Sequence, residues 1–363
     1  MPNQQEIEAV ASQFQVEGEL VRASVIGSGH IHDTFLVEFA HGNSVRRVVL
    51  QRINRKIFAD LPRLMENIAR VTQHQSKQLA GTADASRRAM ALIKTSDGAA
   101  WFSDAQGEAW RMFAHIEVTR TFDAVESVEQ AYQAAKAFGH FQQQLATLPA
   151  PRLHDTIPGF HDTPQRFAAL EAAIGGDTAQ RVKDCGDEIT FVLARKALSR
   201  VLLDANLPER VTHNDTKLNN VLFDETTGEG LCVIDLDTVM PGLALYDFGD
   251  MVRTTTCTAA EDERDLALVY ARADLFEALV RGYLEATRTL LTAEEKSLLF
   301  DAGKVIVFEQ AIRFLADHLR GDTYYKVHRE GQNLDRCRTQ LKLLASLEAQ
   351  ESELRWMVMA WSA

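Results

Sequence analysis

The sequence has few cysteines, no excess of basic residues and no long apolar run. Its four cysteines show no metal-ligand or redox spacing. Lys and Arg number 39 against 51 Asp and Glu, a net charge of −12. This balance argues against nucleic acid as the main partner, because phosphate backbones are bound by a surplus of basic residues. No run of about 18 apolar residues is present, so no membrane-spanning helix is expected.

Targeting signals and repeats are also missing. The first residues carry neither the basic nor the apolar stretch of a secretory signal, so we expect a cytoplasmic protein. No internal repeat or low-complexity tract is visible. The 363 residues are 46% apolar and 25% charged, which is ordinary for a globular protein with one two-lobed unit or two domains. The oligomeric state is left open.

Two acid-bearing segments stand in the middle of the chain. In the first, Asp215 and Asn220 lie five residues apart in the pattern His-x-Asp-x-x-x-x-Asn. In the second, Asp235 follows an apolar strand at residues 231–234. Phosphoryl transfer needs a carboxylate to orient the attacking hydroxyl, and an amide with a second carboxylate to hold Mg²⁺ on the phosphates. The pattern therefore predicts a kinase, with Asp215 as base and Asn220 and Asp235 as metal ligands.

Neighbouring residues each have two interpretations. Lys217 either neutralises charge on the transferred phosphoryl group or is an exposed lysine. Asp237 points the same way as Asp235 along an extended chain and shares the metal, or is a solvated turn carboxylate. Residues 247–249 spell the Asp-Phe-Gly of protein kinases, but no apolar strand precedes them. We interpret Asp247 and Asp250 as acids that brace the catalytic loop or cap the next helix.

The hydrophobic pattern predicts an α+β, bilobal, protein-kinase-like fold. A short helix at 7–14 and one at 60–78, with Asp60 as its N-cap, accompany a small antiparallel sheet. Its strands are expected at residues 20–26, 34–39, 47–53, 89–94, 99–103 and 108–114. Later helices are expected at 128–148, 165–173, 188–206, 263–290, 293–319 and 333–359. We divide the chain into an N-lobe, 1–114, and a helical C-lobe, 115–363, with ligands in the cleft between them.

Nucleotide contacts are expected from the N-lobe. Gly27 and Gly29 lie between the first two strands, where glycines let backbone N–H groups approach phosphates, although a plain hairpin loop also fits. His30 beside them faces the phosphates or the substrate. Phe113 and His115 belong to the expected hinge, where backbone groups pair with adenine. Plain core between the lobes is the alternative for the hinge.

The third strand lacks the lysine that kinases carry there. Gln51 or Arg52 occupies the place, and the alternation with Val49 turns Gln51 toward the cleft. The usual ion pair between that lysine and a helix glutamate is then absent, which leaves Glu66 without its expected partner.

A late helix carries Arg313, and Tyr324 follows it. A guanidinium fork and a phenol hydroxyl suit recognition of vicinal hydroxyls or of an amide on a sugar. Composition alone favours the plainer alternative, a surface ion pair between Arg313 and Asp317.

These motifs resemble those of the aminoglycoside phosphotransferase and choline kinase superfamily, and within it those of the N-acetylhexosamine 1-kinases. The most specific strings are residues 213–222 and 234–242, and the resemblance covers nearly the whole chain. Further similar segments are 29–31, 50–51, 160–164, 246–250, 313–317 and 338–343.

The resemblance implies transfer of phosphate from ATP, with Mg²⁺, to the anomeric hydroxyl of N-acetylglucosamine or N-acetylgalactosamine. By position, it implies that Asp215 is the base and that Asn220 and Asp235 bind the metal. The implied sugar pocket contains His30, Arg313 and Tyr324. The same family also has Gln at the position of Gln51.

Two other hypotheses stay open. A kinase of the same fold could act on another hydroxyl, such as that of an aminoglycoside, choline or homoserine. The missing lysine also permits a nucleotide-binding pseudokinase that serves as a partner-binding module. The leading hypothesis predicts a small-molecule partner, an amino sugar, together with ATP.

Overall fold

The N-terminal part is an antiparallel sheet flanked by two helices. A computed structural model describes residues 2–26 and 31–362 of the chain. Within these residues, six strands form one sheet in the order β1-β2-β3-β6-β4, with β5 pairing to β6. The elements are α1 (Gln4–Ala11), β1 (Glu19–Val25), β2 (Asp33–His41), β3 (Ser44–Ile53), α2 (Leu61–Gln78), β4 (Leu92–Ile93), β5 (Phe102–Ser103) and β6 (Ala109–Ala114).

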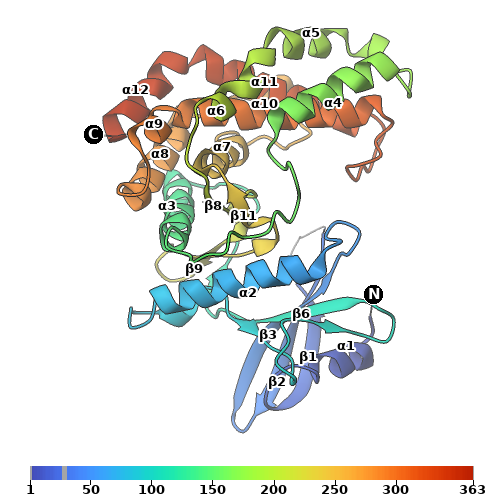
Figure 1. Cartoon of the computed structure of the whole chain (residues 1–363), viewed down its shortest axis with the longest axis vertical. Helices are drawn as coiled ribbons and strands as arrows, with labels where there is room; N and C mark the ends of the chain where they lie inside the picture. The colour runs from blue at the N-terminus through green and yellow to red at the C-terminus, as the bar shows by residue number, and fades with distance from the viewer. Residues whose placement is uncertain (1, 27–30, 363) are drawn as a thin grey trace.

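The two faces of this sheet have different neighbours. Alternation along the strands places Phe35, Val37 and Leu50 in a core with Ile7 of α1. The opposite face contributes Phe113 to the core that α2 shares with the rest of the chain. Helix α2 crosses the molecule between the sheet and the helical part (Figure 1). This second face of the sheet is therefore the one turned toward the two acid-bearing segments.

The remainder of the chain is mostly helical, with short strands at its centre. In the described residues β7, β9 and β10 form one small sheet, and β8 pairs with β11. These strands are β7 (Thr119–Arg120), β8 (Arg210–Thr212), β9 (Val221–Asp224), β10 (Gly230–Val233) and β11 (Met240–Gly242). The helices are α3 (Val128–Leu145), α4 (Thr163–Gly176), α5 (Gly186–Ala194), α6 (Val201–Asp204), α7 (Ala244–Thr255), α8 (Ala273–Thr287), α9 (Ala293–Ser297), α10 (Leu299–Leu319), α11 (Gln332–Ala349) and α12 (Glu351–Ser362).

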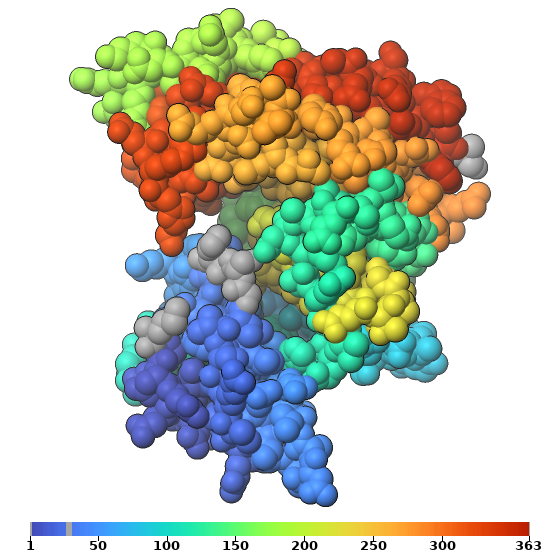
Figure 2. All heavy atoms as spheres, turned by 180° about the vertical axis from the view of Figure 1, so that it is seen from behind, coloured from blue at the N-terminus to red at the C-terminus, as the bar shows by residue number. Residues whose placement is uncertain are grey.

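Helix α10 is the centre of the helical part. Nearly all of its side chains are buried, because α4, α7 and α11 pack around it. Seen from behind, the surface is hollowed between the sheet part, in blue, and the later helices, in orange and red (Figure 2). Among the helices of the described residues, none combines the length and the apolar character needed to cross a membrane.

The α+β class and the kinase-like arrangement are confirmed, and several helix boundaries are corrected. The expected helix at 263–290 is wrong over its first part, since α8 begins at Ala273. The expected helix at 188–206 is interrupted by a 3-10 turn at Lys196–Arg200. Helices α9 and α10 are separate, as are α11 and α12, where single helices were expected. At one of these breaks, the guanidinium of Arg195 binds the carboxylate of Glu348 of α11.

Helix α7 was not predicted at all. Ten of its twelve residues are buried, including Asp247 and Asp250, whose carboxylates bind the loop after β8 instead of facing solvent. From the sequence, its acidic residues are therefore interpreted as separate loop acids and not as one face of a helix. The sheet ends with β6 at Ala114. The division of the chain into lobes at 114/115 stays a prediction.

Candidate active site

The loop after β8 is held by α7. The carboxylate of Asp247 accepts hydrogen bonds from the backbone N–H groups of His213 (3.0 Å) and Asn214 (2.7 Å). One turn later, Asp250 accepts from the N–H of Thr216 at 2.8 Å. These bonds satisfy loop amides that would otherwise be buried without partners. The prediction that Asp247 and Asp250 brace the catalytic loop is therefore confirmed, and their position inside α7 excludes a capping role.

Asp215 lies on this loop beside an amine and an amide. The Nζ of Lys217 lies 2.9 Å from Oδ1 of Asp215 and 3.0 Å from Oδ2. The Nδ2 of Asn220 donates to the backbone carbonyl of Asp215 at 2.8 Å. This bond fixes the amide so that its Oδ1 is the atom left for a cation. The structure thus brings Asp215, Lys217 and Asn220 together, as the sequence spacing predicts.

His213 joins this loop to the second acidic segment. Its Nδ1 accepts a hydrogen bond from the N–H of Asp215 at 3.3 Å, and its Nε2 donates to the carbonyl of Ile234 at 2.9 Å. The ring is fully buried between Phe138 and Phe141, with centroids 5.4 and 5.6 Å away. Because Ile234 precedes Asp235, one imidazole sets the spacing between the two candidate acids.

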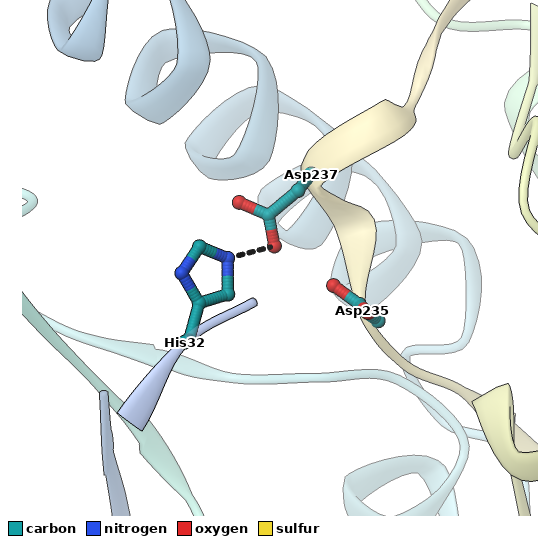
Figure 3. Close-up of side chains that lie close together, drawn as sticks. All are labelled: His32, Asp235 and Asp237. Carbon is teal, nitrogen blue, oxygen red and sulfur yellow. Dashed lines mark ion pairs between the residues drawn. The ribbon is translucent and has the colours of Figure 1, made fainter. Parts of the chain in front are cut away.

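The second acidic segment is a tight turn. Asp235 has a left-handed backbone, with φ of 60°, and Leu236–Thr238 form a 3-10 turn. The prediction that Asp237 follows Asp235 along an extended chain is therefore wrong. The turn still brings the two side chains together, because each offers an oxygen within 4.8 Å of the other (Figure 3). A non-glycine residue held at positive φ is strained backbone of the kind found at functional sites.

The two buried acids differ in their electrostatic behaviour because only Asp237 is paired with Arg111. Burial, followed by the charges of Asp237 and Asp215, raises the pKa of Asp235 well above its usual range. Burial alone would also raise the pKa of Asp237, but the charge of Arg111 holds it well below its usual range. A carboxylate in the position of Asp235 is costly as an isolated anion, and a bound cation would relieve that cost.

Asp237 is clamped from the N-terminal sheet. Both terminal nitrogens of Arg111 lie 2.6 Å from its carboxylate oxygens, in a buried bidentate pair. The Nε of Arg111 donates to Oε1 of Gln51 at 2.9 Å, and Gln51 in turn donates to Thr34. The pair therefore connects β6 of the sheet to the turn that carries the acids.

His32 approaches Asp237 from the start of β2. Its Nε2 lies 3.4 Å from Oδ2 of Asp237, as Figure 3 shows. Its Nδ1 accepts a hydrogen bond from the N–H of Asn54 at 3.1 Å, which leaves the proton of a neutral ring on Nε2. In that tautomer Nε2 carries the proton and has no lone pair free to bind a metal.

Without His32, the predicted cation ligands are oxygens of Asp235, Asp237 and Asn220. Such a hard oxygen set suits Mg²⁺ better than a soft transition metal. Asp235 is buried beside other acids, which raises the pKa of its carboxyl, and these surroundings fit a bound cation.

Two of the nucleotide-site predictions can be placed on the sheet, while Gly27, Gly29 and His30 lie outside the described residues. Gln51 lies on the face of Arg111, whereas Arg52 lies on the other face and pairs with Asp33. Phe113 is buried in the core that includes α2. His115 follows the end of β6, with Nδ1 3.3 Å from Glu117.

Glu66 of α2 has a different partner from the one that kinases use. Its Oε2 lies 2.9 Å from Nε2 of His154, which follows α3. The expectation that no third-strand lysine reaches it therefore holds, and Glu66 is bound to the helical part instead.

Arg313 of α10 lies among aromatic rings. Its guanidinium carbon is 5.4 Å from the centre of Phe160 and 5.8 Å from that of Tyr325. The alternative that Arg313 pairs with Asp317 is wrong, because the Asp317 carboxylate accepts backbone N–H groups of residues 323–325. Tyr324 stacks edge-on against Tyr325 at 4.8 Å and leaves 68% of its surface exposed.

Three residues of the site were missed by sequence reasoning. Arg111, His32 and the bridging role of His213 were not singled out. Arg111 could have been noticed in the sequence as a basic residue within an apolar strand. Only the pairing of β3 with β6 shows that it faces Gln51.

Comparisons with known proteins show the family and the fold of this chain. A model of the phosphotransferase enzyme family (APH) matches residues 22–289. An aminoglycoside phosphotransferase from Alicyclobacillus acidocaldarius is similar in structure, with a TM-score of 0.66 at 13% identity over 99% of this chain and 97% of that one.

Two further solved structures show the same fold. A microcompartment-associated aminopropanol kinase has a TM-score of 0.60 at 15% identity, covering 97% of this chain and 98% of its own. A spectinomycin phosphotransferase in complex with ADP and spectinomycin has a TM-score of 0.59 at 12% identity, covering 97% and 100%. The chain belongs to the phosphotransferase enzyme family, within the aminoglycoside phosphotransferase and choline kinase superfamily that its motifs predict.

Proposed function

We propose that this protein uses ATP and Mg²⁺ to phosphorylate the anomeric hydroxyl of an N-acetylhexosamine, giving the sugar 1-phosphate. The observation that carries the kinase part of the proposal is the bridge through His213, which fixes Asp215 and the Asp235 turn at a set spacing. A base and a cation site that act on the same phosphoryl group need a fixed distance and orientation relative to each other. The complex of the similar spectinomycin phosphotransferase with ADP also supports a nucleotide ligand.

The residues of the catalytic loop have separate roles in this proposal. Asp215 accepts the proton of the sugar hydroxyl and aims its oxygen at the γ-phosphorus. Lys217, within 3.0 Å of Asp215, is placed to balance charge on the transferred group. Asp235, Asp237 and Asn220 would hold the metal. Bound there, Mg²⁺ would supply positive charge to balance the negative charge that develops on the phosphates.

The surroundings of Arg313 favour a neutral acceptor over a cationic one. A choline-type substrate needs open aromatic faces around its quaternary amine. Here the rings of Phe160 and Tyr325 already face the guanidinium of Arg313. A second positive charge would meet that guanidinium, whereas a hydroxyl or an acetamide oxygen would accept its hydrogen bonds. The acetamide of an N-acetylhexosamine supplies such an acceptor, in keeping with the sequence resemblance.

The test is incubation of the protein with ATP, Mg²⁺ and a panel of sugars and amino alcohols. We expect ATP consumption with N-acetylglucosamine or N-acetylgalactosamine, and phosphorus NMR should place the new ester on the anomeric oxygen. An ester at another hydroxyl, or turnover with an amino alcohol alone, would overturn the assignment of the acceptor. Binding of ATP with no transfer to any member of the panel would favour the pseudokinase hypothesis.

A further inference from the structure

The third strand has no lysine, but an arginine on the neighbouring strand lies directly beside the position that the lysine would occupy. Kinases of this fold use a lysine on that strand to neutralise the phosphates and to pair with an acid. Here β3 carries Gln51, and its partner in the register of β3 with β6 is Arg111. Residues directly opposite on neighbouring strands point to the same face of the sheet. Arg111 therefore places a positive charge one strand away from the usual position.

The contacts of Arg111 leave little freedom to its guanidinium. The residue is 1% exposed, with Nε on Gln51 and both terminal nitrogens on Asp237. A fork of this kind fixes both the position and the rotation of a carboxylate, which the single ammonium of a lysine cannot do. A buried arginine with all three nitrogens engaged is a built feature and not a surface pairing.

The pairing of Arg111 with Asp237 affects the predicted metal site. Asp237 lies beside Asp235, and two carboxylates this close repel each other unless cations balance them. Arg111 balances one of the two charges from inside the protein. The charge of Asp235 is then left for a bound metal to balance. The clamp also ties the sheet, which is expected to hold the nucleotide, to the turn that is expected to hold the metal.

We propose that Arg111 is a positioning residue that replaces the third-strand lysine, with Gln51 orienting it and Asp237 transmitting its effect to the Mg²⁺ of a bound nucleoside triphosphate. This inference rests on the proposed function only in requiring a magnesium nucleotide, and it is independent of the acceptor. It assigns to Gln51 the task of holding the guanidinium, and no direct contact with phosphate.

The test measures binding of a non-hydrolysable ATP analogue by calorimetry at increasing Mg²⁺ concentration, without sugar. Arg111→Gln should raise the Mg²⁺ concentration for half-saturation by roughly ten- to a hundred-fold, as for other residues that orient metal ligands. The control is Arg355→Gln, which removes a bidentate arginine from the Asp301 carboxylate between α12 and α10. It should lower the melting temperature without moving the half-saturation point.

A relocation experiment separates charge from simple packing. Gln51→Lys alone puts a second cation beside Arg111 and should weaken Mg²⁺-dependent binding. The same change combined with Arg111→Gln returns the cation to the third strand and should recover part of the loss. If Arg111→Gln proves unstable, Arg111→Lys keeps the charge without the fork and should give a smaller shift in the same direction.

The inference is overturned if Arg111→Gln only lowers the melting temperature, as Arg355→Gln does, or if the relocated lysine recovers nothing. Failure of the sugar assay with wild-type protein that still binds the magnesium nucleotide would overturn the proposed acceptor and leave the role of Arg111 intact. Failure of the wild type to bind the magnesium nucleotide would overturn both.

Discussion

Asp247 holds the backbone of Asn214 in a left-handed conformation. The Oδ1 of Asp247 accepts the N–H of Asn214 at 2.7 Å, and the φ angle of Asn214 is 65°. Asn214 precedes Asp215, so this bond sets the direction in which the candidate base leaves the loop. The Asp-Phe-Gly at 247–249 thus supports the loop from a helix, whereas Asp235 follows the strand at which kinases carry their metal acid.

Replacing Asp247 by Asn should destabilise the loop. An amide offers one acceptor oxygen where the carboxylate receives the N–H groups of His213 and Asn214 and the amide of Gln142. We expect a loss of about 1–3 kcal/mol in the free energy of unfolding, because a buried donor is left without a partner. Urea denaturation measures it, with the exposed surface variant Asp204→Asn as control. Equal stability of the two variants would contradict the bracing role.

Gly249→Ala tests the packing of α7 against α10. A Cβ at Gly249 would lie 2.5 Å from the carbonyl oxygen of Ala302 and 2.6 Å from Ile306. Because one contact is backbone, the two helices must separate, and we expect a loss of about 1–3 kcal/mol. Gly175→Ala in α4 is the matched control, since nothing lies within 4 Å of its Cβ. Thermal unfolding of both variants decides whether the close approach is needed.

Asp215→Asn should abolish turnover while preserving the nucleotide site. The amide keeps the size of the side chain but cannot accept the proton of the hydroxyl. We expect kcat to fall by roughly 10²–10⁴-fold, with the affinity for the ATP analogue nearly unchanged. Steady-state kinetics and calorimetry measure the two quantities. Near-full turnover would mean that another group is the base.

Arg313→Lys should affect the acceptor more than ATP. Lysine retains the charge but lacks the planar fork that lies between Phe160 and Tyr325. We expect the KM for the hexosamine to rise about ten-fold, with the KM for ATP unchanged. Arg320→Lys, at the end of the same helix, serves as control. An equal change in both KM values would place Arg313 outside the sugar pocket.

Asp224 should make stability depend on acidic pH. Hydrogen bonds from Thr227 and the contact with Arg87, opposed by burial, lower the pKa of its carboxyl to about 2. The unfolded value is about 3.9, so the stabilisation is complete above that pH and is lost as the pH falls through about 2. Asp224→Asn should therefore melt below the wild type at pH 7, and the gap should close between about pH 4 and pH 2. A gap that stays constant would show that the charge is not the source.

The sequence by itself determined the fold class and singled out the candidate acids. Alternation of apolar residues predicted the strands of the sheet. The spacing of Asp215 and Asn220 and the apolar strand before Asp235 predicted the site. Both patterns depend on residues close together in the chain. The same local pattern separated the Asp-Phe-Gly at 247–249 from Asp235, the predicted metal ligand. It did not reveal α7, because the acidic residues of that helix, Asp247 and Asp250, bind a buried loop instead of facing solvent.

Only the tertiary structure decided how the site is held together. The bond from His213 to Ile234 spans 21 residues and that from Arg111 to Asp237 spans 126, so no local pattern encodes either contact. The third strand has no lysine, but the sequence carries Arg111 on another strand, β6. Strand pairing places it beside Gln51, because register in a sheet fixes which distant side chains share a face.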